Sequence, residues 1–170
     1  MNKSGVVLDK QALVEIYEHH SPEIFRYAYR MLDDKDSAED CVADTFLRLL
    51  IAVRGGMLPE NIRAYLYRIA HNWIVDRYRG RTPLKNISLE ENSHTNPEGN
   101  PSHLVAQEMD RQRIRSALLQ LPSEQRQVIE LRFMENWSHN EVAVAVGKTV
   151  EATRALQYRA VEALRQILAE

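Results

Sequence analysis

Apolar residues recur at intervals of three and four positions along most of this chain, which is the spacing of one buried face on an amphipathic helix. No stretch alternates strictly between apolar and polar residues, as a half-buried strand would. The pattern therefore predicts an all-α fold without a sheet.

Local signals predict where the first helices begin and break. Pro22 has no backbone N–H to donate, so the first helix is predicted to break or restart near Ser21. Asp36 and Glu39 have the spacing of a capping box and predict the start of the second helix. The residues that this second helix is predicted to bury are Val42, Phe46, Leu49 and Leu50.

A third helix is predicted after the loop that contains Gly55 and Gly56. Asn61 is its expected cap, because an asparagine side chain accepts a hydrogen bond from an otherwise unpaired amide at a helix start. The helix is expected to run to about Arg79 and to bury Leu66, Ile69, Ala70, Trp73 and Ile74.

A polar segment separates the two halves of the chain. Residues 92–103 are rich in Asn, Ser, His and Pro and have almost no apolar content, which is typical of a linker and unusual inside a compact domain. The chain is therefore predicted to contain a disordered tail over residues 1–10 and two small helical domains, over 11–80 and 106–170. A flexible linker over 81–105 is predicted to join them.

The second half contains the more specific motif. Pro122 is predicted to be the first residue of a helix, and Ser138 with Glu141 forms a capping box further on. Gly147 suits the end of the helix that this box begins, and Thr149 can cap the next one. A helix, a short turn with glycine and a second helix make the helix-turn-helix layout, whose second helix enters the major groove of DNA.

The last helix has two different faces. Arg154 and Tyr158 lie one turn apart on the outer face, where they are placed to reach base edges or phosphates. The alternative is a helical hairpin whose outward arginines only keep it soluble. The apolar stripe on the inner face is predicted to comprise Thr153, Leu156, Ala160, Leu164 and Ile167.

Composition and charge narrow the class of protein. The chain has 170 residues, a net charge of -2 and one cysteine, so no internal disulfide can form. No apolar run approaches the roughly 18 residues that span a bilayer, and the first residues lack the apolar core of a signal peptide. We therefore expect a cytoplasmic protein with no direct membrane insertion.

The mild net charge hides two clusters of opposite sign. Acidic residues dominate positions 31–44, where Lys35 is the one base, and basic residues dominate positions 63–85, where Asp76 is the one acid. Two oppositely charged surfaces suggest two different partners. The acids are Asp33, Asp34, Asp36, Glu39, Asp40 and Asp44, and the bases are Arg63, Arg68, Arg77, Arg79, Arg81 and Lys85.

The third predicted helix also has an outer face suited to unpaired bases. Its members are an aromatic ring, an amide and guanidinium groups, and rings stack on bases while arginines hold phosphate. For Tyr65, a place in the core is an equally good interpretation. The residues of this face are Tyr65, Arg68, Asn72 and Arg79.

Enzymatic chemistry finds little support in the sequence. The six histidines are scattered, and no group of Cys and His has the spacing of a zinc site. Neither a glycine-rich phosphate loop nor a nucleophile motif is present. We therefore expect no enzyme activity, no cofactor and no bound metal.

Three segments followed by the helix-turn-helix carry a family resemblance. They are AEDCVADTFLRL (residues 38–49), YLYRIAHNWIVD (65–76) and LPSEQRQVIELR (121–132). In this order they resemble a bacterial RNA polymerase sigma factor of the extracytoplasmic-function (ECF) type, the short form with domains two and four only.

The resemblance implies a function and a set of partners. Domain two would dock on core RNA polymerase and melt and read the minus-ten element, and domain four would read the minus-thirty-five element. The implied partners are the clamp helices and the flap of core polymerase, promoter DNA as duplex and as melted nontemplate strand, and an anti-sigma factor. The alternative is a stand-alone dimeric helix-turn-helix regulator, which would bind a palindromic site.

The resemblance also assigns residues by position. Core-polymerase binding falls to Asp40, Ala43 and Asp44, with alanine standing where the family usually has glutamine. Minus-ten recognition falls to Asn61, Arg63, Tyr65, Arg68, Asn72 and Arg79. Minus-thirty-five recognition falls to Thr149, Val150, Glu151, Arg154 and Tyr158.

Overall fold

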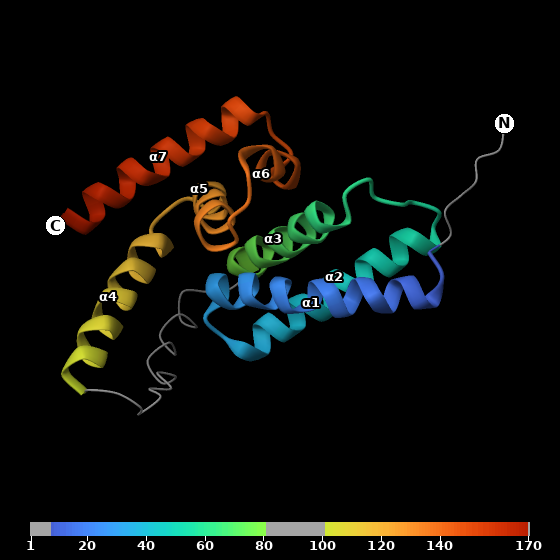
Figure 1. Ribbon diagram of the computed structural model, residues 1–170, viewed down its shortest axis with the longest axis horizontal. Helices are drawn as coiled ribbons and strands as arrows, with labels where there is room; N and C mark the ends of the chain where they lie inside the picture. Colours follow the sequence, from blue (N-terminus) through green and yellow to red (C-terminus); the bar gives the residue numbers. More distant parts are fainter. Residues whose placement is uncertain (1–7, 81–100, 170) are drawn as a thin grey trace. The chain divides into compact units, whose positions relative to one another are not determined.

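The computed structural model describes residues 8–80 and 101–169, with side chains from residue 104 in the second range (Figure 1). Within these ranges the regular elements are all helices, which confirms the all-α prediction. The chain divides into two compact units, unit 1 (Met1–Lys85) and unit 2 (Asn86–Glu170). Most of the predicted tail and linker lies outside the described residues.

Unit 1 is a bundle of three helices, α1 (Lys10–Leu32), α2 (Lys35–Arg54) and α3 (Ile62–Gly80), and each packs against the other two (Figure 1). Their inner faces meet in a core of aliphatic and aromatic side chains. The fully buried large residues of this core are Ile24, Tyr27, Met31, Leu49, Leu66, Tyr67 and Ile74.

The predicted break near Ser21 is wrong, because α1 runs without interruption through Pro22. Pro22 lies on the exposed side of the helix, where water can reach the carbonyl group that the missing N–H leaves unpaired. Burial of Ile24 and Tyr27 just beyond it favours a continuous helix more than the proline opposes it.

The start of α2 also differs from its prediction. The cap is Asp34, whose carboxylate accepts a hydrogen bond from the Ser37 amide at 3.2 Å, and not the predicted Asp36 with Glu39. Asp33 ends α1 in a left-handed conformation, with φ at 54°. The turn between the two helices is therefore very short, and α2 is capped two residues earlier than predicted.

The core of α3 follows the predicted stripe in part. Leu66, Ala70 and Ile74 are buried, whereas Trp73 is half-buried with the Arg77 guanidinium 5.1 Å from its ring centre. Ile69 is half-buried too. Tyr67 fills the core instead and contacts Tyr27 edge to face, with ring centres 5.3 Å apart.

Polar contacts also tie α3 to its neighbours. The Tyr27 hydroxyl and the His71 Nδ1 atom lie 3.0 Å apart in the core between α1 and α3. The Cys41 thiol of α2 donates to the Ala70 carbonyl at 3.8 Å. Because buried polar groups are costly unless paired, these contacts favour a single arrangement of the three helices.

Unit 2 comprises α4 (Pro101–Leu119), α5 (Ser123–Ile129), the π-helical turn η2 (Glu130–Met134), α6 (His139–Val146) and α7 (Val150–Ala169). Helix α7 packs against α4, α5 and α6. The helix α4 begins at Pro101, so the last residues of the predicted linker, 101–105, are helical. The core between α7 and the other helices includes Leu118, Leu121 and Ile129, together with Leu156 and Ala160 of α7 itself.

Pro122 caps α5 and is not its first helical residue, which corrects the prediction. Its backbone is extended, with φ at -53° and ψ at 147°, and Ser123 begins the helix. The Pro122 carbonyl accepts the first helical hydrogen bond, from the Arg126 amide at 2.9 Å.

The described segments contain no helix with both the length and the apolar character needed to cross a membrane.

The burial of Cys41 leads to a testable prediction. Loss of hydration raises the pKa of its thiol to about 12, from an ordinary value of 9.0. The folded state thus favours the neutral thiol, and the stability that this contributes is present below pH 9.0 and is lost as the pH rises toward 12. We expect a thiol reagent at pH 8 to label the native chain about 100-fold more slowly than the urea-unfolded chain.

Labelling is to be followed by mass spectrometry, with the unfolded chain as the reference. Labelling of the native chain at the unfolded rate would contradict the burial of Cys41.

Candidate functional site

The outer face of α2 presents the residues assigned to polymerase docking. Asp40 and Ala43 are exposed, and Asp44 is half-buried and paired with Arg48 at 2.9 Å. The opposite face of the same helix is buried, with Cys41 and Leu49 in the core. Packing of α2 in the bundle therefore orients these three residues outward together.

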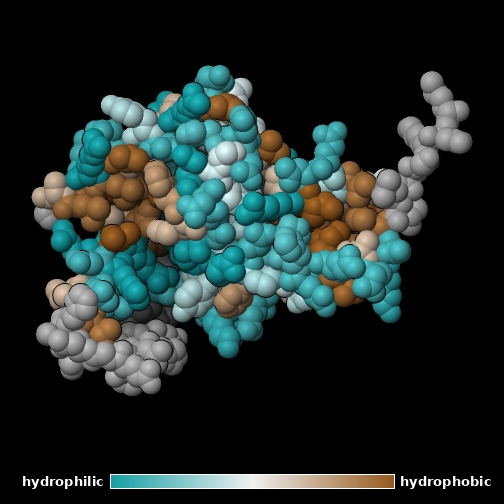
Figure 2. Space-filling view, in the orientation of Figure 1, coloured by the Kyte–Doolittle hydropathy of each residue, from teal (hydrophilic) through white to brown (hydrophobic). Residues whose placement is uncertain are grey.

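Two apolar residues continue this face and were missed in the sequence. The side chains of Leu47 and Ile51 are 52% and 62% exposed, and they follow Asp40 and Asp44 at intervals of three and four residues. In Figure 2, apolar surface gathers at the end of unit 1 where α1 begins and α2 ends. The sequence did carry a signal for them, because both residues fall off the predicted buried stripe of α2. We call Asp40, Ala43, Asp44, Leu47 and Ile51 together the α2 face.

A groove borders the α2 face on the side of α1. Its volume is about 540 Å³, and its lining includes Tyr17, Phe25 and Ala43. The methyl group of Ala43 is small and leaves this groove open. Ser21, Arg26 and Glu39 also line it, so the surface combines carboxylates with a recess of mixed character, a composition that suits a protein partner.

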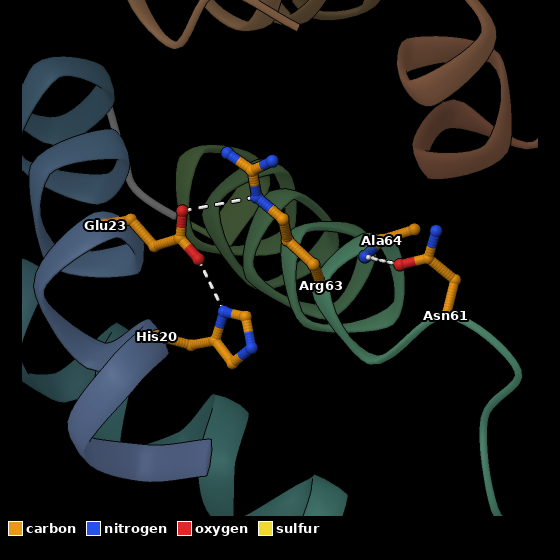
Figure 3. A network of polar contacts seen from close by, with 5 residues as sticks. All are labelled: His20, Glu23, Asn61, Arg63 and Ala64. Atoms are coloured by element: carbon orange, nitrogen blue, oxygen red, sulfur yellow. Dashed lines mark hydrogen bonds and ion pairs between the residues drawn. The ribbon is translucent and has the colours of Figure 1, made fainter. Parts of the chain in front are cut away.

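The start of α3 is held by two polar contacts (Figure 3). The Asn61 side chain accepts a hydrogen bond from the Ala64 amide at 3.0 Å, which confirms the predicted cap. The Arg63 Nε atom lies 3.2 Å from a carboxylate oxygen of Glu23 on α1, and the other oxygen of Glu23 lies 2.5 Å from the His20 Nδ1 atom. Asn61 and Arg63, both assigned to DNA, therefore also hold the helix in place.

The remaining residues assigned to the minus-ten element share one face of α3. Arg68, Asn72 and Arg79 are exposed and are spaced by four and seven residues. Tyr65 is half-buried at the near end of this face, and the acidic Asp76 lies exposed between Asn72 and Arg79. The face therefore combines an accessible ring edge, an amide and cations.

The loop before α3 exposes apolar side chains. Met57 and Leu58 are 48% and 40% exposed, and Gly56 adopts a φ of +86°, which favours glycine. The Met57 amide donates to the Ala52 carbonyl at 2.9 Å, so the loop folds back on the end of α2. The sequence predicted this loop from Gly55 and Gly56 but did not single out its exposed apolar side chains.

The helix-turn-helix forms as predicted. Both hydrogen bonds of the Ser138–Glu141 capping box are present, at 3.0 and 3.1 Å. Gly147 ends α6 in the left-handed conformation, with φ at 69°, and the Thr149 hydroxyl caps α7 by accepting from the Ala152 amide at 3.1 Å.

The outer face of α7 presents the residues assigned to the minus-thirty-five element. Glu151 and Arg154 are exposed, Tyr158 is 70% exposed, and Val150 is half-buried. On the inner face Thr153, Leu156 and Ala160 are buried, while Leu164 and Ile167 are half-buried. The first half of α7 thus offers a cation and an aromatic ring on one accessible side.

A brace between η2 and α7 was not predicted. The Arg132 Nε atom donates to the Gln157 side chain at 3.3 Å, and its guanidinium also donates to the Trp137 carbonyl.

Burial lowers the pKa of His139 below its ordinary value, and the positive charges of Arg132 and Arg154 lower it further. His139, the first residue of α6, is therefore neutral beside this face at physiological pH.

Metal binding finds no support in the part of the chain that is described. Within residues 8–80 and 101–169, no group of three or more His, Cys, Asp or Glu side chains is arranged to hold an ion.

Comparison with known proteins identifies the family. Residues 16–83 match the Sigma-70 region 2 model, and residues 117–166 match the Sigma-70 region 4 model. ECF RNA polymerase sigma factor SigL of Mycobacterium tuberculosis is 31% identical, over 98% of this chain and 95% of SigL. The chain belongs to the ECF sigma factors. As a sigma factor it directs promoter-specific initiation by RNA polymerase.

Other relatives agree with this assignment. RNA polymerase sigma factor YlaC of Bacillus subtilis is 26% identical, over 89% of this chain and 88% of YlaC. Two solved structures share the fold. CnrH in complex with the cytosolic domain of CnrY has a TM-score of 0.67 and 24% identity, over 95% of this chain and 90% of CnrH. The sigma factor RpoE of Bartonella quintana in complex with the anti-sigma factor NepR has a TM-score of 0.64 and 23% identity, over 94% of this chain and 96% of RpoE. Because sigma-factor models match both halves, the stand-alone regulator is not retained.

Thr149 caps α7 and is also assigned to the minus-thirty-five element, and its capping role leads to a prediction for unit 2. Thr149→Val keeps the shape of the side chain but removes the hydroxyl that caps α7, so we expect a loss of about 1 kcal/mol in the free energy of unfolding. Thr149→Ser keeps the hydroxyl and serves as the control. The free energy of unfolding of unit 2 is measured by urea unfolding. Trp137 fluorescence reports on unit 2 alone once Trp73 of unit 1 is replaced by Phe. Equal losses of stability in Thr149→Val and Thr149→Ser would contradict the cap.

Proposed function

We propose that the α2 face docks this sigma factor on core RNA polymerase. Asp40 and Asp44 supply negative charge for a basic partner helix, and Leu47 and Ile51 supply apolar area beside it. This pairing of outward-facing acids with exposed apolar residues along one helix is the observation that carries the proposal. Complementary charge would steer the two proteins together, and apolar contact would stabilise the complex.

Helix α3 and the loop before it melt and read the minus-ten element in this proposal. Tyr65 offers a ring for stacking, and the exposed side chains of Arg68, Asn72 and Arg79 follow along one face. Stacking contributes about 1–3 kcal/mol per base, which is comparable with the cost of unstacking a base from a duplex. Asn61 and Arg63 contribute mainly by fixing the start of the helix.

Helix α7 reads the minus-thirty-five element in the major groove. Thr149 caps this helix, its N-terminal half carries Val150, Glu151, Arg154 and Tyr158, and the first residues of a recognition helix are those that reach base edges. Arg154 is placed for a bidentate contact with a guanine or for a phosphate. Glu151 would accept from a cytosine amino group or exclude other bases.

The chain needs no chemistry of its own to do this, because the polymerase makes the RNA. A chain with a net charge of -2 has little general attraction for DNA, so free duplex binding is expected to be weak. Fixing both units on one polymerase would make the second DNA contact intramolecular and strengthen it. The compartment of this activity is the cytoplasm.

An anti-sigma factor is the proposed regulator. CnrH and RpoE, which share the fold, were each solved with a bound partner, the cytosolic domain of CnrY and the anti-sigma factor NepR respectively. A partner that covers the α2 face of this chain would block its docking on polymerase.

Charge reversal on α2 tests the docking proposal. We expect the double variant Asp40→Arg with Asp44→Arg to bind purified core polymerase at least about 100-fold more weakly, because like charges then oppose each other. The control is Glu15→Arg with Glu18→Arg, an equal change on the exposed side of α1. Core binding measured by fluorescence anisotropy reads both, and wild-type affinity in the α2 variant would overturn the proposal.

A second variant tests the proposed role of α7. We expect Arg154→Ala to weaken promoter binding by the holoenzyme about tenfold and to leave core binding unchanged. The control, Arg165→Ala, removes a charge near the end of the same helix. Binding to promoters with an intact and a scrambled minus-thirty-five element is compared, and an undiminished preference in Arg154→Ala would contradict the assignment.

A further inference from the structure

The carboxylate of Glu23 lies at the centre of a three-residue contact in unit 1 (Figure 3). Its side chain is only 13% exposed, and each of its oxygens faces a different partner, Arg63 at 3.2 Å and His20 at 2.5 Å. Arg63 lies 40 positions further along the chain, in the first turn of α3. Glu23 therefore joins the middle of α1 to the start of the helix assigned to the minus-ten element.

The first turn of α3 has no acidic residue of its own. Helix starts carry unpaired amides and a partial positive charge, which nearby carboxylates stabilise. Asn61 satisfies one amide, that of Ala64, but it brings no charge. Glu23 brings a negative charge from another helix to this first turn through its ion pair with Arg63.

The loop between α2 and α3 is attached at both ends. At the α2 end, the amides of Gly55, Gly56 and Met57 donate to carbonyl groups of the last turn of the helix. At the α3 end, the attachments are the Asn61 cap and the contact of Arg63 with Glu23. The direction in which the loop presents Leu58 thus depends on how firmly the start of α3 is held.

Glu23 remains charged in this environment. Burial by itself would raise its pKa, but the hydrogen bond with His20 and the charge of Arg63 outweigh that effect and hold the pKa below 4.5. The ion pair with Arg63 therefore persists at neutral pH. It weakens only as the pH falls below the ordinary range of a glutamate.

We infer that Glu23 is a positioning residue for promoter opening, which acts by holding Arg63 and so fixing the start of α3 and the loop before it. The inference rests on the proposed role of α3 in melting the minus-ten element. In this arrangement Arg63 forms an ion pair within the protein and does not contact DNA. The competing interpretation is that Arg63 contacts DNA directly and Glu23 plays no part.

The experiment compares holoenzymes assembled from core polymerase and variants of the full chain. The variants are Glu23→Gln, Arg63→Gln and the double variant, and Glu18→Gln is the control because Glu18 is exposed on the same helix. The promoter is selected from a random library by the wild-type holoenzyme. Opening is followed by the fluorescence of 2-aminopurine in its minus-ten element, and core affinity is measured in parallel.

We expect Glu23→Gln and Arg63→Gln each to slow opening about tenfold, and the double variant to be no slower than the slower single variant, because both remove the same contact. Core affinity and Glu18→Gln should match the wild type. On a template whose minus-ten segment is kept unpaired by mismatches, the single variants should recover to within about twofold. A general loss of folding would lower core affinity and would not recover on this template.

Two results would overturn the inference. Opening at the wild-type rate by Glu23→Gln, with slow opening by Arg63→Gln, would make Arg63 a direct DNA contact. Slow initiation by Glu23→Gln on the mismatched template, or weaker core binding, would reduce Glu23 to a residue of the general fold. If the wild-type holoenzyme itself opens no promoter, the proposed function fails first, and the inference fails with it.

Discussion

Each binding helix of this sigma factor offers only one face, because the other face is buried in the core of its unit. In α2, Cys41 and Leu49 lie in the core, and this leaves Asp40, Asp44 and Leu47 facing outward. The same holds for α7, where buried Leu156 sets the outward direction of the residues around it. Core packing therefore determines which side chains face outward, and a change of register would remove both surfaces.

Division into two units places the two surfaces assigned to DNA on separate cores. The outer face of α3 belongs to unit 1, together with the α2 face, and the outer face of α7 belongs to unit 2. Neither surface is rich enough in charge to bind DNA strongly alone, since Asp76 interrupts the bases of α3 and Glu151 begins the face of α7. In the proposed mechanism, holding both units on one polymerase would let two weak contacts suffice.

Sequence reasoning was most successful where the deciding contact is local. The caps by Asn61 and Thr149 and the capping box at Ser138 are confirmed, because each joins residues three positions apart. It failed where distant packing decides: α1 continues through Pro22, and Tyr67 rather than Trp73 fills the core. Likewise, the contact of Arg63 with a residue 40 positions away has no signature in the sequence.

Run-off transcription with purified core polymerase tests the central claim most directly. The template carries the promoter selected by the holoenzyme, and matched templates have either element scrambled. The account predicts one transcript that requires this chain and falls with either element. Transcription that ignores both elements, or a chain that fails to associate with core polymerase at low salt, would contradict it.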